Sequence, residues 1–153
     1  DIGLCKKLGA QGIVSGVLNK DKTIDIARTK ALIELSRPLP FTFHRAFDEL
    51  DNPIQGLNQL IELGVDRVLT SGRKSSAVDG LPLLTQLNEI ARGRLTILPG
   101  GGINVENAII FKTNGFTEIH TSASTKVNQG EGLFSSLQTV SDQQKIKAIL
   151  NAL

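Results

Sequence analysis

Short apolar, β-branched runs alternate with segments of helical period along most of this 153-residue chain. The runs begin about 22–29 residues apart, the spacing of strand–helix units joined by short loops. Between them apolar residues recur at helical spacing, as at Leu57, Leu60 and Ile61. This alternation predicts an α/β fold with a parallel sheet and covering helices. The five expected strands are residues 12–18, 41–44, 67–71, 95–98 and 118–122.

Helix start signals agree with this alternation. Asn52 followed by Pro53 has the pattern of an N-cap and a first helical residue. Residues 76–79 (Ser-Ala-Val-Asp) have the spacing of a capping box, and Asn104 precedes another helical stretch. We therefore expect helices to begin at these three places.

Helix stop signals agree as well. Gly9, Gly64 and Gly115 stand where helices are expected to end in the left-handed conformation. Residues 124–142 are polar and rich in Gly and Ser, which predicts a loop, and residues 143–153 have the period of a last helix. We expect residues 1–123 to form the strand–helix domain, with the loop and last helix belonging to the same domain.

Composition excludes several functional classes. The formal charge is +2, too small and too evenly mixed to favour a nucleic-acid partner. No apolar run approaches the roughly 20 residues that cross a bilayer, so no membrane association is expected. The single cysteine cannot form an internal disulfide, and this favours a reducing compartment.

The stretch at residues 41–48 carries the most unusual polar cluster. Ligands of parallel strand–helix folds bind at the carboxyl ends of the strands, where His44, Arg45 and Asp48 are expected. Histidine titrates near neutral pH and can move a proton, arginine can hold a carboxylate or phosphate, and Asp48 can orient either. These three are the candidate catalytic residues. The alternative is a salt-bridged plug at the end of the sheet.

A triple glycine supplies the candidate anion site. Gly100, Gly101 and Gly102 follow a strand and precede a helix, so their amides can approach an anion, or they can simply form a tight turn. Hydroxyl side chains at neighbouring strand ends can add contacts. These are Thr70, Ser71 and Ser122.

The sequence allows both a functional and a structural role for two further residues, His120 and Cys5. His120 lies inside an expected strand and is either a ligand or a packed core histidine. Cys5 precedes two lysines, which favour a reactive thiolate, or it is a partly buried small side chain.

Several motifs occur in an order that closely resembles the copper homeostasis protein CutC family. They are residues 12–18 (GIVSGVL), 37–48 (RPLPFTFHRAFD), 67–72 (RVLTSG), 80–83 (GLPL) and 99–103 (PGGGI). The resemblance covers roughly residues 1–123. It implies a TIM (β/α)₈ barrel, a cytoplasmic and in animal members also nuclear location, a homo-oligomer, and a role in copper tolerance.

The same resemblance implies a partial barrel. An eight-stranded barrel takes about 250 residues, so this chain corresponds to about five strands with their helices and is expected to lack the first three strand–helix units. The cysteine-bearing strands that look like the family's best copper ligands lie in those units. Cu(I) prefers soft sulfur donors, and this chain has one Cys, two His and no Met, so a self-contained copper site is not expected. The candidate copper donors are Cys5 of several copies, or His44 and His120.

Three functional hypotheses follow. The first is copper binding or trafficking of the CutC type. The second is a TIM-barrel enzyme acting on a small phosphate- or carboxylate-bearing substrate through His44, Arg45 and the loop of Gly100 to Gly102. The third is a chain that acts only through assembly, because the strands of Ile13 and Ile119 would be unpaired edges.

Overall fold

The computed structural model describes residues 1–129 and 136–153 and confirms the α/β class. Its main sheet has four strands in the order β1-β2-β3-β4, and every neighbouring pair is parallel. The order follows the sequence, as in successive strands of a barrel. The strands are β1 (Ile13–Ser15), β2 (Phe41–Phe43), β3 (Arg67–Thr70) and β4 (Thr96–Pro99).

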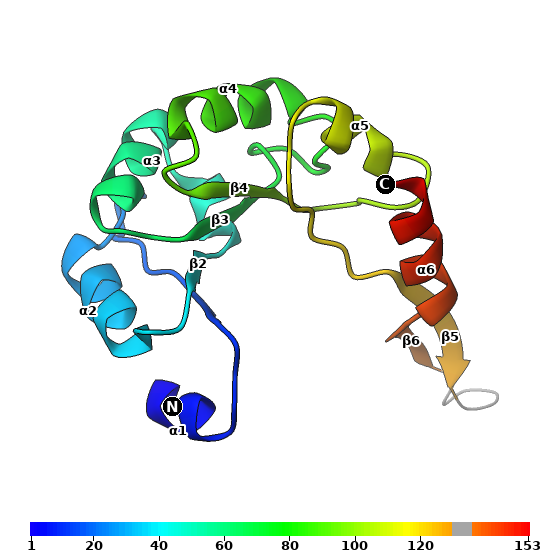
Figure 1. The fold of residues 1–153 in the computed structure, drawn as a ribbon, viewed down its shortest axis with the longest axis horizontal. Helices are drawn as coiled ribbons and strands as arrows, with labels where there is room; N and C mark the ends of the chain where they lie inside the picture. Colours follow the sequence, from blue (N-terminus) through cyan, green and yellow to red (C-terminus); the bar gives the residue numbers. More distant parts are fainter. Residues whose placement is uncertain (130–135) are drawn as a thin grey trace.

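The sheet and its helices form an arch (Figure 1), with the strands along its inner side and the helices along its outer side. The α1 helix (Ile2–Lys7) lies at the N-terminal end of the arch. A 3-10 helix, η1 (Arg45–Glu49), follows β2 directly. The outer helices are α2 (Ile26–Ser36), α3 (Pro53–Glu62), α4 (Leu81–Ala91) and α5 (Ala108–Thr113).

The hydrophobic core lies between the strands and the outer helices. Phe41 and Phe43 of β2 are fully buried, and so are Leu57 and Leu60 of α3 and Leu84 of α4. Burying a large apolar side chain contributes about 1.5–3 kcal/mol, so this layer is the main source of stability.

The opposite, concave side of the sheet is open. Val14 of β1 is 62 % exposed there. Arg67 of β3 reaches across β4 to Glu118, with Nε–Oε2 and Nη2–Oε1 distances of 2.7 and 2.8 Å. Such contacts between alternate strands are typical of the interior layers of a barrel. The arch is therefore a barrel segment with its interior face uncovered.

The fifth expected strand is reduced to one bridge. Within residues 118–122, only His120 pairs with the sheet, through a parallel bridge to Gly100 and a 2.8 Å bond from its amide to the Pro99 carbonyl. The Thr121 hydroxyl donates to the Ile103 carbonyl at 2.7 Å and accepts from the Ala123 amide at 3.1 Å. These side-chain bonds take the place of a strand ladder just beyond the bridge, which is why the sequence pattern overstated this strand.

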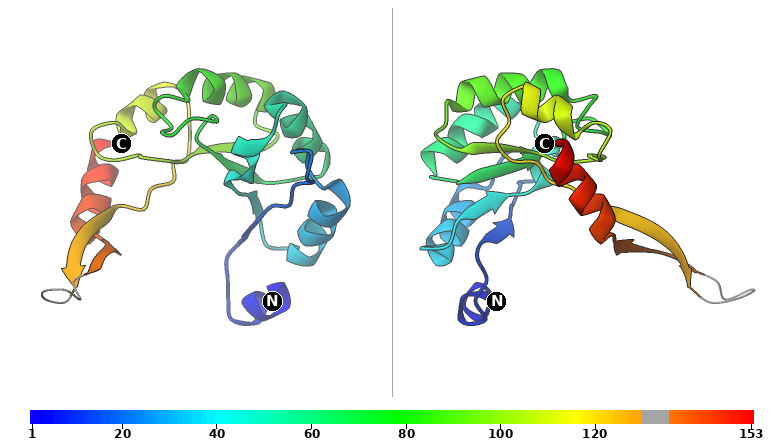
Figure 2. Two further views of the ribbon diagram at one scale, coloured as in Figure 1. Left: turned by 180° about the vertical axis from the view of Figure 1, so that it is seen from behind. Right: turned by 45° about the vertical axis from the view of Figure 1, so that its right-hand side comes forward.

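The sequence predicted a loop at residues 124–142, but the structure has two antiparallel strands there, β5 (Ser124–Gln129) and β6 (Ser136–Ser141). Residues 130–135 of the predicted loop lie outside the described residues. Figure 2 shows this pair projecting away from the arch. The sequence of residues 124–142 is mostly polar and lacks the apolar alternation that identifies a strand. The final helix is confirmed as α6 (Gln143–Ala152), with Asp142 as its N-cap.

Most helix boundaries follow the sequence signals. Asn52 caps α3, accepting from the Gln55 amide at 3.0 Å. Gly9, Gly64 and Gly115 all have positive φ angles, between 74° and 81°. At residues 76–79 the Asp79 amide donates to the Ser76 hydroxyl, as in a capping box, but the Asp79 carboxylate accepts from that hydroxyl and α4 begins later, at Leu81. A turn also follows Asn104, and α5 begins at Ala108.

Across the described ranges, no helix combines the length and apolar character that a bilayer crossing requires.

Candidate functional site

A cavity of about 220 Å³ lies at the carboxyl ends of β3 and β4, where the sequence predicted ligand binding. We call it the strand-end pocket. It joins η1, the glycine loop after β4 and the segment after the His120 bridge. Its lining residues are Arg45, Leu69, Gly101, Gly102, Ile103, His120, Thr121 and Ser122.

The glycine loop needs its glycines for two reasons. Gly101 and Gly102 have φ angles of +121° and +71°, which residues with a side chain rarely adopt. A Cβ atom on Gly100 would lie 2.6 Å from Leu69 Cδ1. Within the described part of the chain, no protein acceptor meets the amides of Gly101, Gly102 or Ile103. The loop therefore offers unpaired amide donors beside the pocket, the arrangement that suits an anion.

Asp48 holds the polar cluster together. Its side chain is only 9 % exposed. It accepts from the Thr70 hydroxyl at 2.5 Å, the Ser71 hydroxyl at 3.1 Å, and the backbone amides of Ser71 and Arg73. Burial works to raise the pKa of Asp48, but the hydrogen bonds from Thr70, Arg45, Arg73 and Ser71 outweigh it and hold that pKa below its ordinary value. The ionised Asp48 carboxylate thus links η1 to the loop after β3 through hydrogen bonds.

Arg45 is held by hydrogen bonds to Asp48 and Ser71, and its side chain lines the pocket. Its Nε donates to Asp48 Oδ2 at 2.8 Å and its Nη2 donates to the Ser71 hydroxyl at 2.7 Å. The side chain is still 48 % exposed. Its Nη1 lies 3.7 Å from where a Cβ on Gly101 would stand. A guanidinium carries five N–H donors, so donors remain for an anion between Arg45 and the glycine loop.

His44 is separated from the other two members of the predicted catalytic trio, because it does not line the strand-end pocket. It is the N-cap of η1, and its Nδ1 accepts from the Ala46 amide at 3.2 Å. This bond leaves the proton of the neutral ring on Nε2. The ring packs edge-on against Phe43, with a centroid distance of 5.9 Å.

The predicted hydroxyl residues divide into two groups. Thr70 and Ser71 are buried. The Thr70 hydroxyl donates to Asp48, and the Ser71 hydroxyl lies 2.6 Å from the Lys74 carbonyl and 3.1 Å from Asp48, so both residues hold the polar cluster in place. Ser122 is exposed and lines the pocket, with its hydroxyl 3.1 Å from that of Ser124. His120 is also exposed in the pocket, so it is not a packed core histidine.

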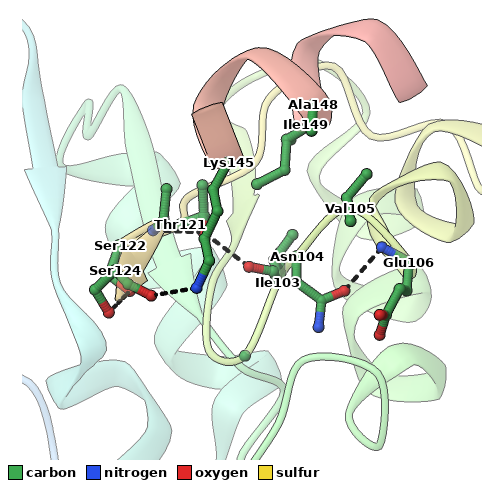
Figure 3. A pocket seen from close by; sticks show the side chains of 12 residues that line it. Ile103, Asn104, Val105, Glu106, Thr121, Ser122, Ser124, Lys145, Ala148 and Ile149 are labelled. Carbon is green, nitrogen blue, oxygen red and sulfur yellow. Dashed lines mark hydrogen bonds between the residues drawn. The ribbon is translucent and has the colours of Figure 1, made fainter. Parts of the chain in front are cut away.

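A second cavity of about 380 Å³ adjoins the first (Figure 3). Its lining includes Asn104, Val105 and Glu106 from one side, and Lys145 and Ile149 of α6 from the other. We call it the α6 cavity. Sequence reasoning missed it, because α6 carries only a helical period and no signal of what the helix packs against.

Within one copy of the chain, the copper-donor residues predicted from the sequence do not form a shared centre. Cys5 is exposed on α1, at the β1 end of the sheet, while His120 pairs beyond β4 at the opposite end. Over residues 1–129 and 136–153, no group of three or more His, Cys, Asp or Glu side chains is placed to hold a metal ion. A single exposed thiol and two separate imidazoles do not match the soft, convergent donor set that Cu(I) prefers.

Comparisons with known proteins agree with the sequence resemblance. A sequence model of the CutC family matches residues 1–125. A CutC family protein of Pasteurella multocida is 51 % identical over 123 residues, which are 80 % of this chain and 50 % of the relative. The mouse copper homeostasis protein cutC homolog is 48 % identical over 131 residues, 85 % of this chain and 48 % of its own.

A solved CutC structure from Streptococcus agalactiae matches the fold. It has a TM-score of 0.72 and 28 % identity, covering 78 % of this chain and 59 % of its own. The chain thus spans about half the length of the two relatives named above.

Proposed function

Since this chain belongs to the CutC family, we propose that it takes part in copper homeostasis by binding a small phosphate- or carboxylate-bearing ligand in the strand-end pocket. The observation that carries this proposal is the guanidinium of Arg45, which Asp48 and Ser71 hold against the glycine loop. The fixed arginine and the unpaired loop amides converge on one cavity. Both are preferred partners of phosphate and carboxylate oxygens.

The position of the pocket supports the same proposal. Phosphate sites of (β/α)₈ barrels lie in the loops after the last two strands. Here the glycine loop follows β4, and Ser122 follows the segment that bridges to it. The prearranged arginine lowers the entropic cost of binding, because its side chain is already ordered by Asp48.

The pocket also supports the hypothesis of an enzyme acting on a small anionic substrate, with His120 in place of His44. His120, not His44, is the imidazole that lines the pocket. An exposed imidazole beside a bound anion can exchange a proton with it. His120 therefore becomes the candidate general acid or base, with Arg45 as the anion-holding group.

Copper binding or trafficking by this chain's own residues is the alternative that family membership raises. The donors available to it are Cys5, His44 and His120, which lie at separate places in the fold. We propose that the chain contributes the anion-binding part of the family's function and does not coordinate copper by itself. We also propose a cytoplasmic location and, from the exposed edge of β1, association between copies.

Titration calorimetry with inorganic phosphate tests this proposal, with Arg28→Gln as the matched control, because Arg28 is a surface arginine that pairs with Asp25 within its own helix turn. We expect saturable binding at one site and at least a tenfold loss of affinity in Arg45→Gln, since a charged hydrogen-bond donor is worth about 1.5–3 kcal/mol. Equal affinity of the two variants would contradict the proposal. Tight, stoichiometric Cu(I) binding by the wild-type chain would contradict the proposal that the chain does not coordinate copper by itself.

A further inference from the structure

The strand-end pocket and the α6 cavity are adjacent parts of one surface. Gly102, Ile103, Thr121 and Ser122 line both of them. The Thr121 hydroxyl is bonded to the Ile103 carbonyl at 2.7 Å, which fixes the two segments between the cavities relative to each other. A ligand whose anionic head lies on Arg45 and the glycine loop can therefore extend past Gly102 into the α6 cavity.

The α6 cavity has an apolar floor. Ile103 and Ile149 are 5 % and 4 % exposed, and Val105 adds a more exposed apolar side chain. Figure 3 shows Ile149 directed from α6 toward Val105 and Ile103. An apolar segment bound here is removed from water, which is favourable in proportion to the buried area.

Lys145 places a cation at one side of this floor. Its Nζ donates to the Ser124 carbonyl at 2.8 Å, near the Ser122 hydroxyl (Figure 3). An ammonium has three donors, so two remain for a ligand. Thr121, Ser122 and Ser124 add polar lining, and Asn104 and Glu106 line the other side of the cavity. A second anionic group is therefore favoured on the Lys145 side and disfavoured next to Glu106.

We infer that the ligand is a bifunctional organic anion, with a phosphate-like head in the strand-end pocket, a short apolar segment over Ile103 and Ile149, and a second acceptor group held by Lys145. This inference rests on the proposed function and adds a specificity-determining residue to it. Lys145 lies in α6, beyond the residues 1–125 that the family model matches. The α6 helix thus completes a cavity whose other lining residues, 102–106 and 121–124, lie within the matched range.

Three probes separate the two halves of the site: inorganic phosphate, n-butyl phosphate and 4-phosphonobutanoate, which carries a carboxylate at its far end. We expect butyl phosphate to bind about tenfold more tightly than inorganic phosphate, because its carbon chain is buried on the apolar floor. Val105→Ser should remove part of that gain and leave inorganic phosphate unaffected. Val105 suits this test because its side chain is 44 % exposed and its replacement leaves the core intact.

Lys145→Gln tests the distal cation, with Lys147→Gln on the same helix as the matched control. We expect Lys145→Gln to weaken 4-phosphonobutanoate at least fivefold and to leave inorganic phosphate unchanged, whereas Lys147→Gln should change neither. Equal affinity of the wild-type chain for all three probes, or equal behaviour of the two lysine variants, would overturn the inference and leave phosphate binding intact. A wild-type chain that binds none of the probes would overturn the proposed function as well.

Discussion

Asp48 concentrates more of the site's hydrogen bonding than any other single side chain described above. It links Arg45, Thr70, Ser71 and Arg73, and therefore joins η1 to the loop after β3. A carboxylate in this position contributes to both stability and function. It keeps the loop folded and aims the guanidinium of Arg45 at the glycine loop.

Asp48→Asn should lower the free energy of unfolding at pH 7 by about 2 kcal/mol, because it removes charged hydrogen bonds at a mostly buried position. Asp51→Asn is the control, since Asp51 is exposed. The pKa of Asp48 is lower in the folded chain than in the unfolded one, so the folded state binds fewer protons in acid. The contribution of Asp48 is thus complete above about pH 4 and is lost as pH falls through the folded-state pKa.

Urea unfolding of both variants from pH 7 down into the acid range measures this contribution. We expect the difference between Asp48→Asn and the wild type to shrink below about pH 4. A difference that is independent of pH would show that the charge of Asp48 is not what stabilises the cluster.

At the residue scale, the sequence identified much of the site. The motif at residues 41–48 and the triple glycine pointed to Arg45, Asp48, Gly101 and Gly102, because such residue types at strand ends are costly unless paired or bound. The sequence could not assign roles within the motif. Whether His44 or His120 faces the cavity depends on how η1 turns after β2. Lys145 was missed because its position depends on where α6 packs.

The β3–α4 loop depends on a close approach between Gly72 and Gly80. A Cβ on Gly80 would lie 1.9 Å from the Ser71 carbonyl oxygen. The loop is also tied to the glycine loop, because the Ala77 amide donates to the Gly101 carbonyl at 2.9 Å. A displacement of this loop would therefore reach Ser71, Arg45 and the strand-end pocket together.

Gly80→Ala should lower the free energy of unfolding by about 2–3 kcal/mol, because the methyl group overlaps a backbone atom and the loop must move. Phosphate affinity should fall with it. Gly3→Ala on α1 is the control, since a Cβ there meets nothing within 4 Å. We expect this variant to lose no stability and to gain at most about 1 kcal/mol, because alanine is the better helix former. Urea unfolding compares the two, and equal stability would contradict the tight packing of this loop.

At the element scale, the sequence predicted buried strands better than exposed ones. β2 and the caps of α3 were recognisable because buried apolar runs and N-cap side chains leave local signals. The β5–β6 ribbon and the shortening of the fifth strand to a bridge were not. Both depend on pairing choices among polar residues, which periodicity does not encode.

At the scale of the whole molecule, the fold class followed from the alternation of strands and helices alone, because a parallel sheet requires crossover helices. The arch leaves a concave face on which Arg67 and Glu118 pair across β4. This curvature turns the carboxyl ends of β3 and β4 toward the His120 segment. The strand-end pocket is thus a consequence of barrel-like curvature, with its walls supplied by four successive units of the chain: η1 after β2, β3, the glycine loop after β4 and the His120 segment.

The amide spectrum of the isotope-labelled chain during titration with inorganic phosphate tests the central claim most directly, because each backbone N–H reports separately. We predict saturable shifts of the Gly101, Gly102 and Ser122 amides, and the loss of those shifts in Arg45→Gln but not in Arg28→Gln. Unchanged glycine-loop amides, or shifts confined to lysine-rich surfaces away from the pocket, would contradict the claim that this chain binds an anion at the ends of its strands.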